Sequence, residues 1–491
     1  MKQYLYITLM LLCIGTTSCK KDFLNVVPKG KQVAITTQDY NLLMNNPDLY
    51  LKSFAGGWQS LVLMGDEVAA EGSYFNNAQL VSQNAFKWNA DIFQPTDIDW
   101  SVRLWLEEMY TLNKVIIEVP ASAAGSEQQK LEIRAEAMAN RAFINFQFVN
   151  FYGKPYLAAT AGTDPGFPLI KTADITEKNF IRNTVQEDYD AIISDLNVAI
   201  ANLPAAHAGG KTRFSKASAE GILGKVYLFM GKNAEALAMF NAAFTDNAAA
   251  TVPARLYDYN AEFADGGMFV PIQYNGPNSS PGNDYNDVTE SILARTFYNS
   301  SYSGNGFEND FLVLAPKMQA LFGASDLRLN FYAAEFPYQT PNPSGRLSKY
   351  AVSYSKFGLQ ISELYLLRAE AKARLNDMAG AKADVETLRK SRMPAVEATI
   401  PTVDMASQKT LLQFIFDERL REFASEGYRW LDMRRLSVDP LFEGATYTHT
   451  VYNDEVPNST NLTTYTLNPV RLTLKLSPFV MNSNPQFTNN P

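Results

Sequence analysis

The sequence predicts a mainly helical protein in which helical hairpins are interrupted by an irregular, loop-rich subdomain. Two segments, 215–244 and 359–391, place small residues where two helices would cross, a bulky residue one turn further on, and a turn signal between the helices. This is the pattern of tetratricopeptide-like hairpins. Residues 246–355, which separate the two, are rich in Gly, Asn, Ser, Pro and Tyr. The scaffold is therefore expected to be interrupted and not a continuous array.

The beginning of the chain is typical of an export signal followed by a lipid-attachment site. Lys2 precedes the apolar run 4–14, and small residues lead to Cys19. Because the run is shorter than the roughly 20 residues that span a bilayer, we expect residues 1–18 to be cleaved. Cys19 would then be acylated, as in the lipobox of bacterial lipoproteins, and several acyl chains would anchor the protein stably. The alternative is an ordinary secretory signal that happens to be followed by cysteine.

Composition limits the classes of function. With 491 residues, 46% of them hydrophobic, the chain can bury a large core. A formal charge of −8 without basic runs argues against nucleic acid as a partner. Cys13 would leave with the signal and Cys19 would carry lipid, so we expect no disulfide in the mature protein.

Several helices follow the short tether at 19–30. Segments 105–119 and 131–152 have the apolar spacing of packing helices. Thr184 is placed to cap a helix that Pro204 ends, with Glu187 completing a capping box.

We divide the remaining chain into three regions. The expected regions are a helical part at 31–245 that contains an aromatic loop at 54–100, the loop-rich insertion at 246–355, and a part at 356–491 with the second hairpin and an irregular tail.

Glu418, Glu422 and Glu426 recur every four residues, which places them on one face of a predicted helix and could indicate a glycosidase carboxylate pair. Three arginines lie in the same stretch: Arg419, Arg421 and Arg429. Neighbouring guanidinium groups lower the pKa of a carboxyl group, whereas a general acid needs a raised pKa. We therefore interpret the glutamates as part of a bracing ion-pair network.

The two histidines do not indicate a metal site. His207 and His449 are far apart and lack metal-ligand spacing, and each is predicted to be a solvated loop residue. No phosphate loop or nucleophile elbow is present in the sequence. We expect no catalytic residue, no cofactor and no metal.

Aromatic and amide side chains are the better indication of function. They alternate in the loop 54–100 and in the insertion, and this combination is typical of sites for polar ligands. The candidate ligand-binding residues are Trp88, Trp100, Tyr285 and Tyr298, with Asp66 as a weaker polar candidate. The alternative is that these rings fill the core of the irregular subdomain.

Motifs along the whole chain resemble the SusD/RagB family of outer-membrane lipoproteins. They lie at 22–28, 105–113, 134–153, 418–435 and 477–485. The stretch ERLREFASEGYRWLDMRR at 418–435 is similar to the family's "ERRxELxxEGxRxxDLxR". At the C-terminal end, Val480 or Met481 stands where the family usually has glutamate.

The resemblance implies a SusD-like fold and a non-catalytic lipoprotein on the outer surface of the outer membrane. Such a protein binds an oligosaccharide and delivers it to a SusC-like TonB-dependent transporter. A peptide-binding, RagB-like protein is the alternative, and a surface glycosidase or a pure interaction scaffold is a further rival. The ligand residues of the family lie in loops without a motif, so our candidates rest on region and composition.

Overall fold

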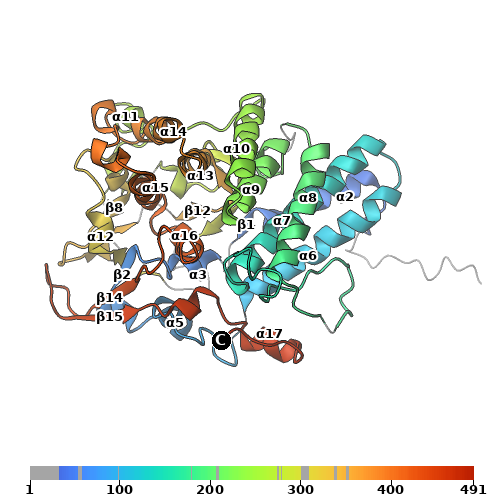
Figure 1. Cartoon of the computed structure of the whole chain (residues 1–491), viewed down its shortest axis with the longest axis horizontal. Helices are drawn as coiled ribbons and strands as arrows, with labels where there is room; N and C mark the ends of the chain where they lie inside the picture. Colours follow the sequence, from blue (N-terminus) through green and yellow to red (C-terminus); the bar gives the residue numbers. More distant parts are fainter. Residues whose placement is uncertain are drawn as a thin grey trace, which may run out of the picture.

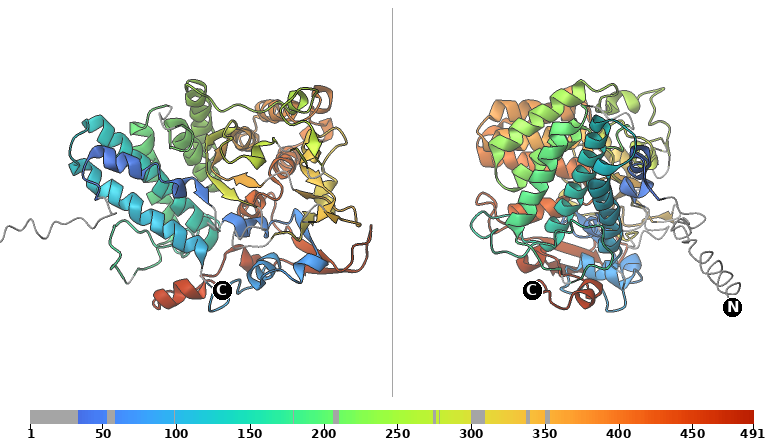
Figure 2. Two further views of the ribbon diagram at one scale, coloured as in Figure 1. Left: turned by 180° about the vertical axis from the view of Figure 1, so that it is seen from behind. Right: turned by 90° about the vertical axis from the view of Figure 1, so that its right-hand side faces the viewer.

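The computed structural model describes residues 33–52, 58–97, 99–178, 180–205, 210–273, 276–277, 279–299, 309–336, 340–349 and 353–491. The predicted signal and tether, Cys19 and His207 lie outside the described residues. The longer helices lie at one end of the molecule and along one side, and the short strands of the insertion lie at the opposite end (Figures 1 and 2).

Most of the long helices pack against their neighbours in the chain. The long helices are α6 (Trp100–Glu118), α7 (Glu127–Tyr152), α8 (Val185–Asn202), α9 (Lys216–Phe229), α10 (Asn233–Ala248), α13 (Ile361–Arg374), α14 (Met378–Lys390), α15 (Gln408–Phe423) and α16 (Tyr428–Leu436). Shorter helices are α2 (Thr37–Leu43), α3 (Trp58–Val62), α4 (Gly72–Phe75), α5 (Leu80–Phe86), α11 (Tyr259–Glu262), α12 (Pro316–Gln319) and α17 (Pro478–Ser483). In the described part of the chain, no helix has the length and apolar character needed to cross a membrane.

Local sequence explains where α8 begins. The Thr184 side chain accepts a hydrogen bond from the backbone of Glu187, and the Glu187 carboxylate accepts one from the backbone of Thr184. Two donors that a helix start leaves unpaired are thereby satisfied. The capping box predicted at this position is confirmed.

Both predicted hairpins are confirmed as the pairs α9/α10 and α13/α14. The first pair packs closely because Gly224 lacks a Cβ atom, which would lie 2.5 Å from the Phe240 ring. Helix α10 packs against α13, so the two hairpins are neighbours in space although the insertion separates them in sequence. The insertion therefore protrudes from a helical scaffold that is continuous in space.

Short strands tie the insertion to both ends of the chain. The largest sheet has the order β15-β14-β2-β7, formed by Leu462–Thr466, Thr448–Tyr452, Val68–Glu71 and Leu312–Leu314. Strand β14 runs parallel to β2, with Val451 opposite Ala70, and β2 runs antiparallel to β7. Segments from the beginning, middle and end of the chain therefore share one sheet.

A second sheet has the order β1-β6-β12, formed by Leu51–Lys52, Thr296–Tyr298 and Tyr354–Lys356. Four two-stranded pairs complete the strands. Their members are β3 (Ile272–Gln273), β4 (Gly276–Pro277), β5 (Ser291–Leu293), β8 (Tyr332–Ala333), β9 (Glu335–Phe336), β10 (Thr340–Pro341), β11 (Ser348–Lys349) and β13 (Leu359–Gln360).

Candidate functional site

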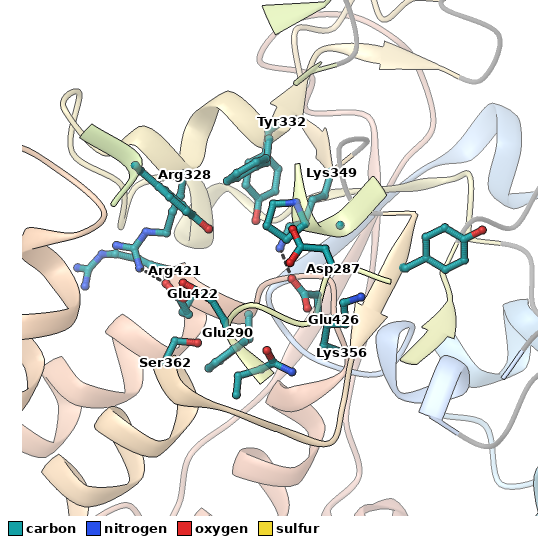
Figure 3. Close-up of a pocket in the computed structure, with 17 residues that line it drawn as sticks. Asp287, Glu290, Arg328, Tyr332, Lys349, Lys356, Ser362, Arg421, Glu422 and Glu426 are labelled. Atoms are coloured by element: carbon teal, nitrogen blue, oxygen red, sulfur yellow. Dashed lines mark hydrogen bonds and ion pairs between the residues drawn. The ribbon is translucent and has the colours of Figure 1, made fainter. Parts of the chain in front are cut away.

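A cavity of about 100 Å³ lies between the insertion and the C-terminal end of α15. The insertion contributes residues near 281–290, 328–332 and 349–356, and the helical side contributes the start of α13 and residues 421–426. Arg328, Arg421 and Glu422 lie at one end, and Lys349, Lys356 and Glu426 lie at the other (Figure 3).

Glu418 and Glu422 are held by arginines at the first end of the cavity. The Glu418 carboxylate accepts hydrogen bonds from Arg328 at 2.7 Å, Arg389 at 2.6 Å and Arg421 at 2.7 Å. The Glu422 carboxylate accepts from Arg328 at 3.0 Å and from Arg392 at 2.7 Å. Burial disfavours both ionised carboxylates, but the arginines outweigh it and lower both pKa values.

The predicted ion-pair network is therefore present, but its geometry differs from our prediction in one respect. Helix α15 ends at Phe423, so Glu426 does not share its face with Glu418 and Glu422. Glu426 lies in the following turn, where Ser425 and Gly427 have φ values of 61° and 88°, and it pairs with Lys349 at 2.7 Å.

Two of the three arginines named from the sequence pair with other carboxylates instead of with these glutamates. Arg419 pairs with Asp432 at 2.9 Å, and Arg429 pairs with Asp66 at 2.6 Å. Arg328 and Arg392, which come from the insertion and from the residues after α14, take their place at the network.

Glu290 and Glu422 are the carboxylates that come closest to a glycosidase pair. Burial raises the pKa of Glu290, whereas Arg392 lowers that of Glu422. However, the Nη2 atom of Arg392 donates to both carboxylates, at 2.9 Å to Glu290 and 2.7 Å to Glu422. A guanidinium group thus occupies the space in which hydrolysis would require the scissile bond.

Three tyrosines gather at the edge of the cavity, and we call Tyr285, Tyr298 and Tyr354 the tyrosine cluster. Tyr298 on β6 and Tyr354 on β12 are directly opposite in register, with ring centroids 5.3 Å apart. The Tyr285 and Tyr354 rings lie 5.7 Å apart, and Tyr285 is 43% exposed. Tyr354 also lines the cavity. The cluster is thus connected to the cavity through Tyr354.

The structure therefore brings together two of the candidate residues, Tyr285 and Tyr298, through a third that the sequence did not reveal. Tyr354 went unnoticed because β12 has only three residues and carries no visible periodicity. Its burial pattern gives no signal either, because Ser355 and Lys356 are both buried and do not alternate.

Trp88 occupies a different environment. It is only 4% exposed, its indole nitrogen donates to the Met64 carbonyl at 2.9 Å, and its ring stacks on His449 with centroids 3.8 Å apart. Its surface is thus covered by protein, as the alternative interpretation of the aromatic set anticipates.

Asp66 and Trp100 are distant in sequence from the three residues of the tyrosine cluster. Asp66 is buried and pairs with Arg429 and Lys317, and these cations outweigh burial and hold its pKa far below the ordinary value. Trp100 is the first residue of α6.

The expectation that His449 is a solvated loop residue is wrong. His449 is fully buried in β14, and its ring is sandwiched between Phe86 and Trp88. Its two ring nitrogens each lie 2.7 Å from a backbone carbonyl oxygen, those of Phe86 and Gly65. Burial lowers the pKa of this imidazole to about 4.

Two family models match the sequence. One, described as the SusD family, matches residues 350–491, and the other, described as starch-binding associating with outer membrane, matches residues 48–228. No curated protein matches.

Solved structures resemble most of the chain. A putative sugar binding protein from Bacteroides vulgatus ATCC 8482 has 19% sequence identity and a TM-score of 0.65, over 94% of this chain and 99% of that protein. A SusD superfamily protein from Bacteroides thetaiotaomicron VPI-5482 has 17% identity and a TM-score of 0.67, over 93% and 100%. A laminarin binding SusD-like protein has 20% identity and a TM-score of 0.62, over 94% and 100%.

A scaffold of paired helices that carries a strand-rich insertion places the chain in the class of proteins with the SusD-like fold. The matches to both family models agree with this class. The chain belongs to the SusD/RagB family.

Proposed function

We propose that this protein captures an oligosaccharide outside the cell without cleaving it and delivers it to a SusC-like TonB-dependent transporter in the outer membrane. The tyrosine cluster at the edge of the cavity is the observation that carries the proposal. Tyrosine rings offer rigid apolar faces to the C–H groups of sugars, and their hydroxyls can hydrogen-bond to sugar hydroxyls. The family membership and the names of two similar structures support a sugar as the ligand.

A protein that passes its ligand onward should release it readily. We expect affinities in the micromolar to millimolar range, which correspond to about 8 to 4 kcal/mol of binding free energy. A few stacked rings and hydrogen bonds are sufficient for this range. Trp100 remains a candidate contact by its place in the aromatic loop, whereas we assign Trp88 and Asp66 to the supporting structure.

Alanine at Tyr285, Tyr298 or Tyr354 should weaken oligosaccharide binding by about 1 to 3 kcal/mol, because each substitution removes a contacting ring. The melting temperature should change little for Tyr285, whose side chain is the most exposed of the three. Calorimetric titration with a panel of neutral and acidic oligosaccharides, including laminari-oligosaccharides, measures the effect.

Tyr110→Ala is the matched control for these variants, since Tyr110 is 38% exposed on α6 and does not line the cavity. If wild-type affinity is retained in all three cluster variants, the cluster is not the binding surface. Binding of peptides instead of sugars would favour the RagB-like alternative, and cleavage of the oligosaccharide would favour the glycosidase.

The anchor is tested separately. Cys19→Ala should abolish acylation, because Cys19 supplies the thiol to which the lipid would be attached, and should release the protein from the membrane fraction. Metabolic labelling with a fatty acid and fractionation of cells measure the two effects. An unacylated variant that stays in the membrane fraction would exclude the proposed lipid anchor.

A further inference from the structure

Lys356 lies on the same face of β12 as Tyr354, since side chains two residues apart in a strand point the same way. Both residues line the cavity, and Lys356 is only 9% exposed. Its amine donates hydrogen bonds to the backbone carbonyls of Asp284 at 3.1 Å and Tyr285 at 3.3 Å. The ammonium group is therefore fixed beside the tyrosine cluster.

The other cations that line the cavity are paired with carboxylates. Arg328 pairs with Glu422, Lys349 with Glu426, and Arg421 with the buried Glu418. Lys356, in contrast, forms no ion pair with any carboxylate of the described residues. A buried charge without a counter-ion is costly, so this ammonium group is a place where an external anion would be stabilised.

The acidic groups nearest to Lys356 are Asp287, Asp284 and Glu426, and each accepts hydrogen bonds from donors other than the Lys356 amine. The Asp287 carboxylate accepts hydrogen bonds from the Tyr257 hydroxyl at 2.8 Å and from the Thr289 backbone at 3.0 Å. The Asp284 carboxylate accepts from the Asn286 backbone at 2.8 Å.

The Glu426 carboxylate forms an ion pair with the Lys349 amine. An ammonium group has three donors, and the two carbonyls of Asp284 and Tyr285 leave the third for a ligand.

We propose that Lys356 recognises the anionic substituent, a carboxylate or a sulfate ester, of an acidic oligosaccharide whose sugar rings lie on the tyrosine cluster. This inference rests on the proposed function and specifies its ligand class. The cavity of about 100 Å³ has room for such a substituent together with several water molecules.

The affinity of this site should depend on pH. Burial lowers the pKa of Lys356 to about 8, although Asp287, Asp284 and Glu426 oppose that shift. The ammonium charge is present below about pH 8 and is lost as the pH rises through this value. An anionic ligand should therefore bind more weakly at pH 9 than at pH 7, whereas a neutral ligand should bind equally at both.

Calorimetric titration with trigalacturonate, a sulfated trisaccharide and the matched neutral galactotriose tests the inference. Wild-type protein should bind at least one of the acidic trisaccharides about tenfold more tightly than the neutral one, as expected for a charge-assisted hydrogen bond. Lys356→Gln should abolish that preference, so that the acidic and the neutral trisaccharides bind the variant with equal affinity. Raising the salt concentration should weaken only the acidic ligand.

Lys211→Gln is the matched control. The Lys211 amine also donates to two backbone carbonyls of the same segment, those of Val288 and Thr289, both at 3.0 Å. Lys211 lines a different cavity, and Lys211→Gln removes the same positive charge as Lys356→Gln. This variant should keep the wild-type preference.

The outcomes separate the two proposals. Equal binding of acidic and neutral sugars, or a preference that survives Lys356→Gln, overturns the role of Lys356 while the proposed function stands. Binding of an acidic peptide but of no sugar overturns both. If Lys356→Gln does not fold, the salt and pH dependence of the wild-type protein decides, since an affinity for the acidic ligand that is independent of both overturns the inference.

Discussion

Glu418→Ala should lower the free energy of unfolding by about 3 to 5 kcal/mol, because the substitution removes the carboxylate that pairs with Arg389 and Arg421 and one of the carboxylates that pair with Arg328. Glu418 is fully buried and accepts hydrogen bonds from Arg328, Arg389 and Arg421. These three cations come from the insertion, α14 and α15, so the loss would loosen the contact between the scaffold and the insertion. Urea denaturation followed by circular dichroism measures the change.

Glu127→Ala is the control for this loss of charge. Glu127 pairs with Lys130 on the surface of α7, and its side chain is 85% exposed. Exposed pairs contribute only about 0 to 1 kcal/mol, so this variant should remain close to the wild-type protein. Equal stability of the two variants would show that Glu418 is not a bracing residue.

The pH dependence of the free energy of unfolding tests the role of Glu418 in a second way. The folded-state pKa of Glu418 lies well below its ordinary value of 4.5, because the arginines outweigh burial. A carboxyl group with a depressed pKa stabilises the fold above its unfolded pKa, and this contribution is lost as the pH falls toward the folded-state value. Acidification below about pH 4.5 should therefore destabilise the wild-type protein more than Glu418→Ala.

Trp88→Ala should lower the free energy of unfolding by about 3 to 5 kcal/mol without weakening ligand binding by the folded protein. Truncation would leave a cavity beside His449 and remove the hydrogen bond to the Met64 carbonyl. Thermal melting and calorimetric titration of the same variant measure the two effects. A variant that melts like the wild-type protein but no longer binds oligosaccharide would restore Trp88 to the binding surface.

Much of the helical scaffold could be predicted because its signals are local. The capping box at Thr184 and the small residues of the two hairpins depend on neighbours within a few turns. The strands could not be predicted in the same way, since several have only two or three residues and are defined by partners distant in sequence. A strand that short shows no alternation from which its face or its partner can be inferred.

The candidate site could likewise be predicted only where its signals are local in the sequence. Tyr285 and Tyr298 could be selected by composition, but their connection through Tyr354 depends on the pairing of β6 with β12. The network around Glu418 could be anticipated from adjacent arginines, whereas Arg328 and Arg392 reach it only through the tertiary fold. His449 was misplaced because a polar residue in a threonine-rich segment gives no sign of the ring stack that buries it.

The parallel pairing of β14 with β2 sets an order of events during synthesis. Ala70 can pair with Val451 only after Val451 has been synthesised. At a rate of synthesis of about 5–20 residues per second, that takes on the order of tens of seconds. Such distant contacts form slowly because a long loop must close before they contribute stability. The N-terminal region therefore cannot complete its sheet while the chain is still growing, and a chain cut short before residue 448 would keep an unpaired edge on β2. The last part of the chain to be made thus decides when the first part can finish folding.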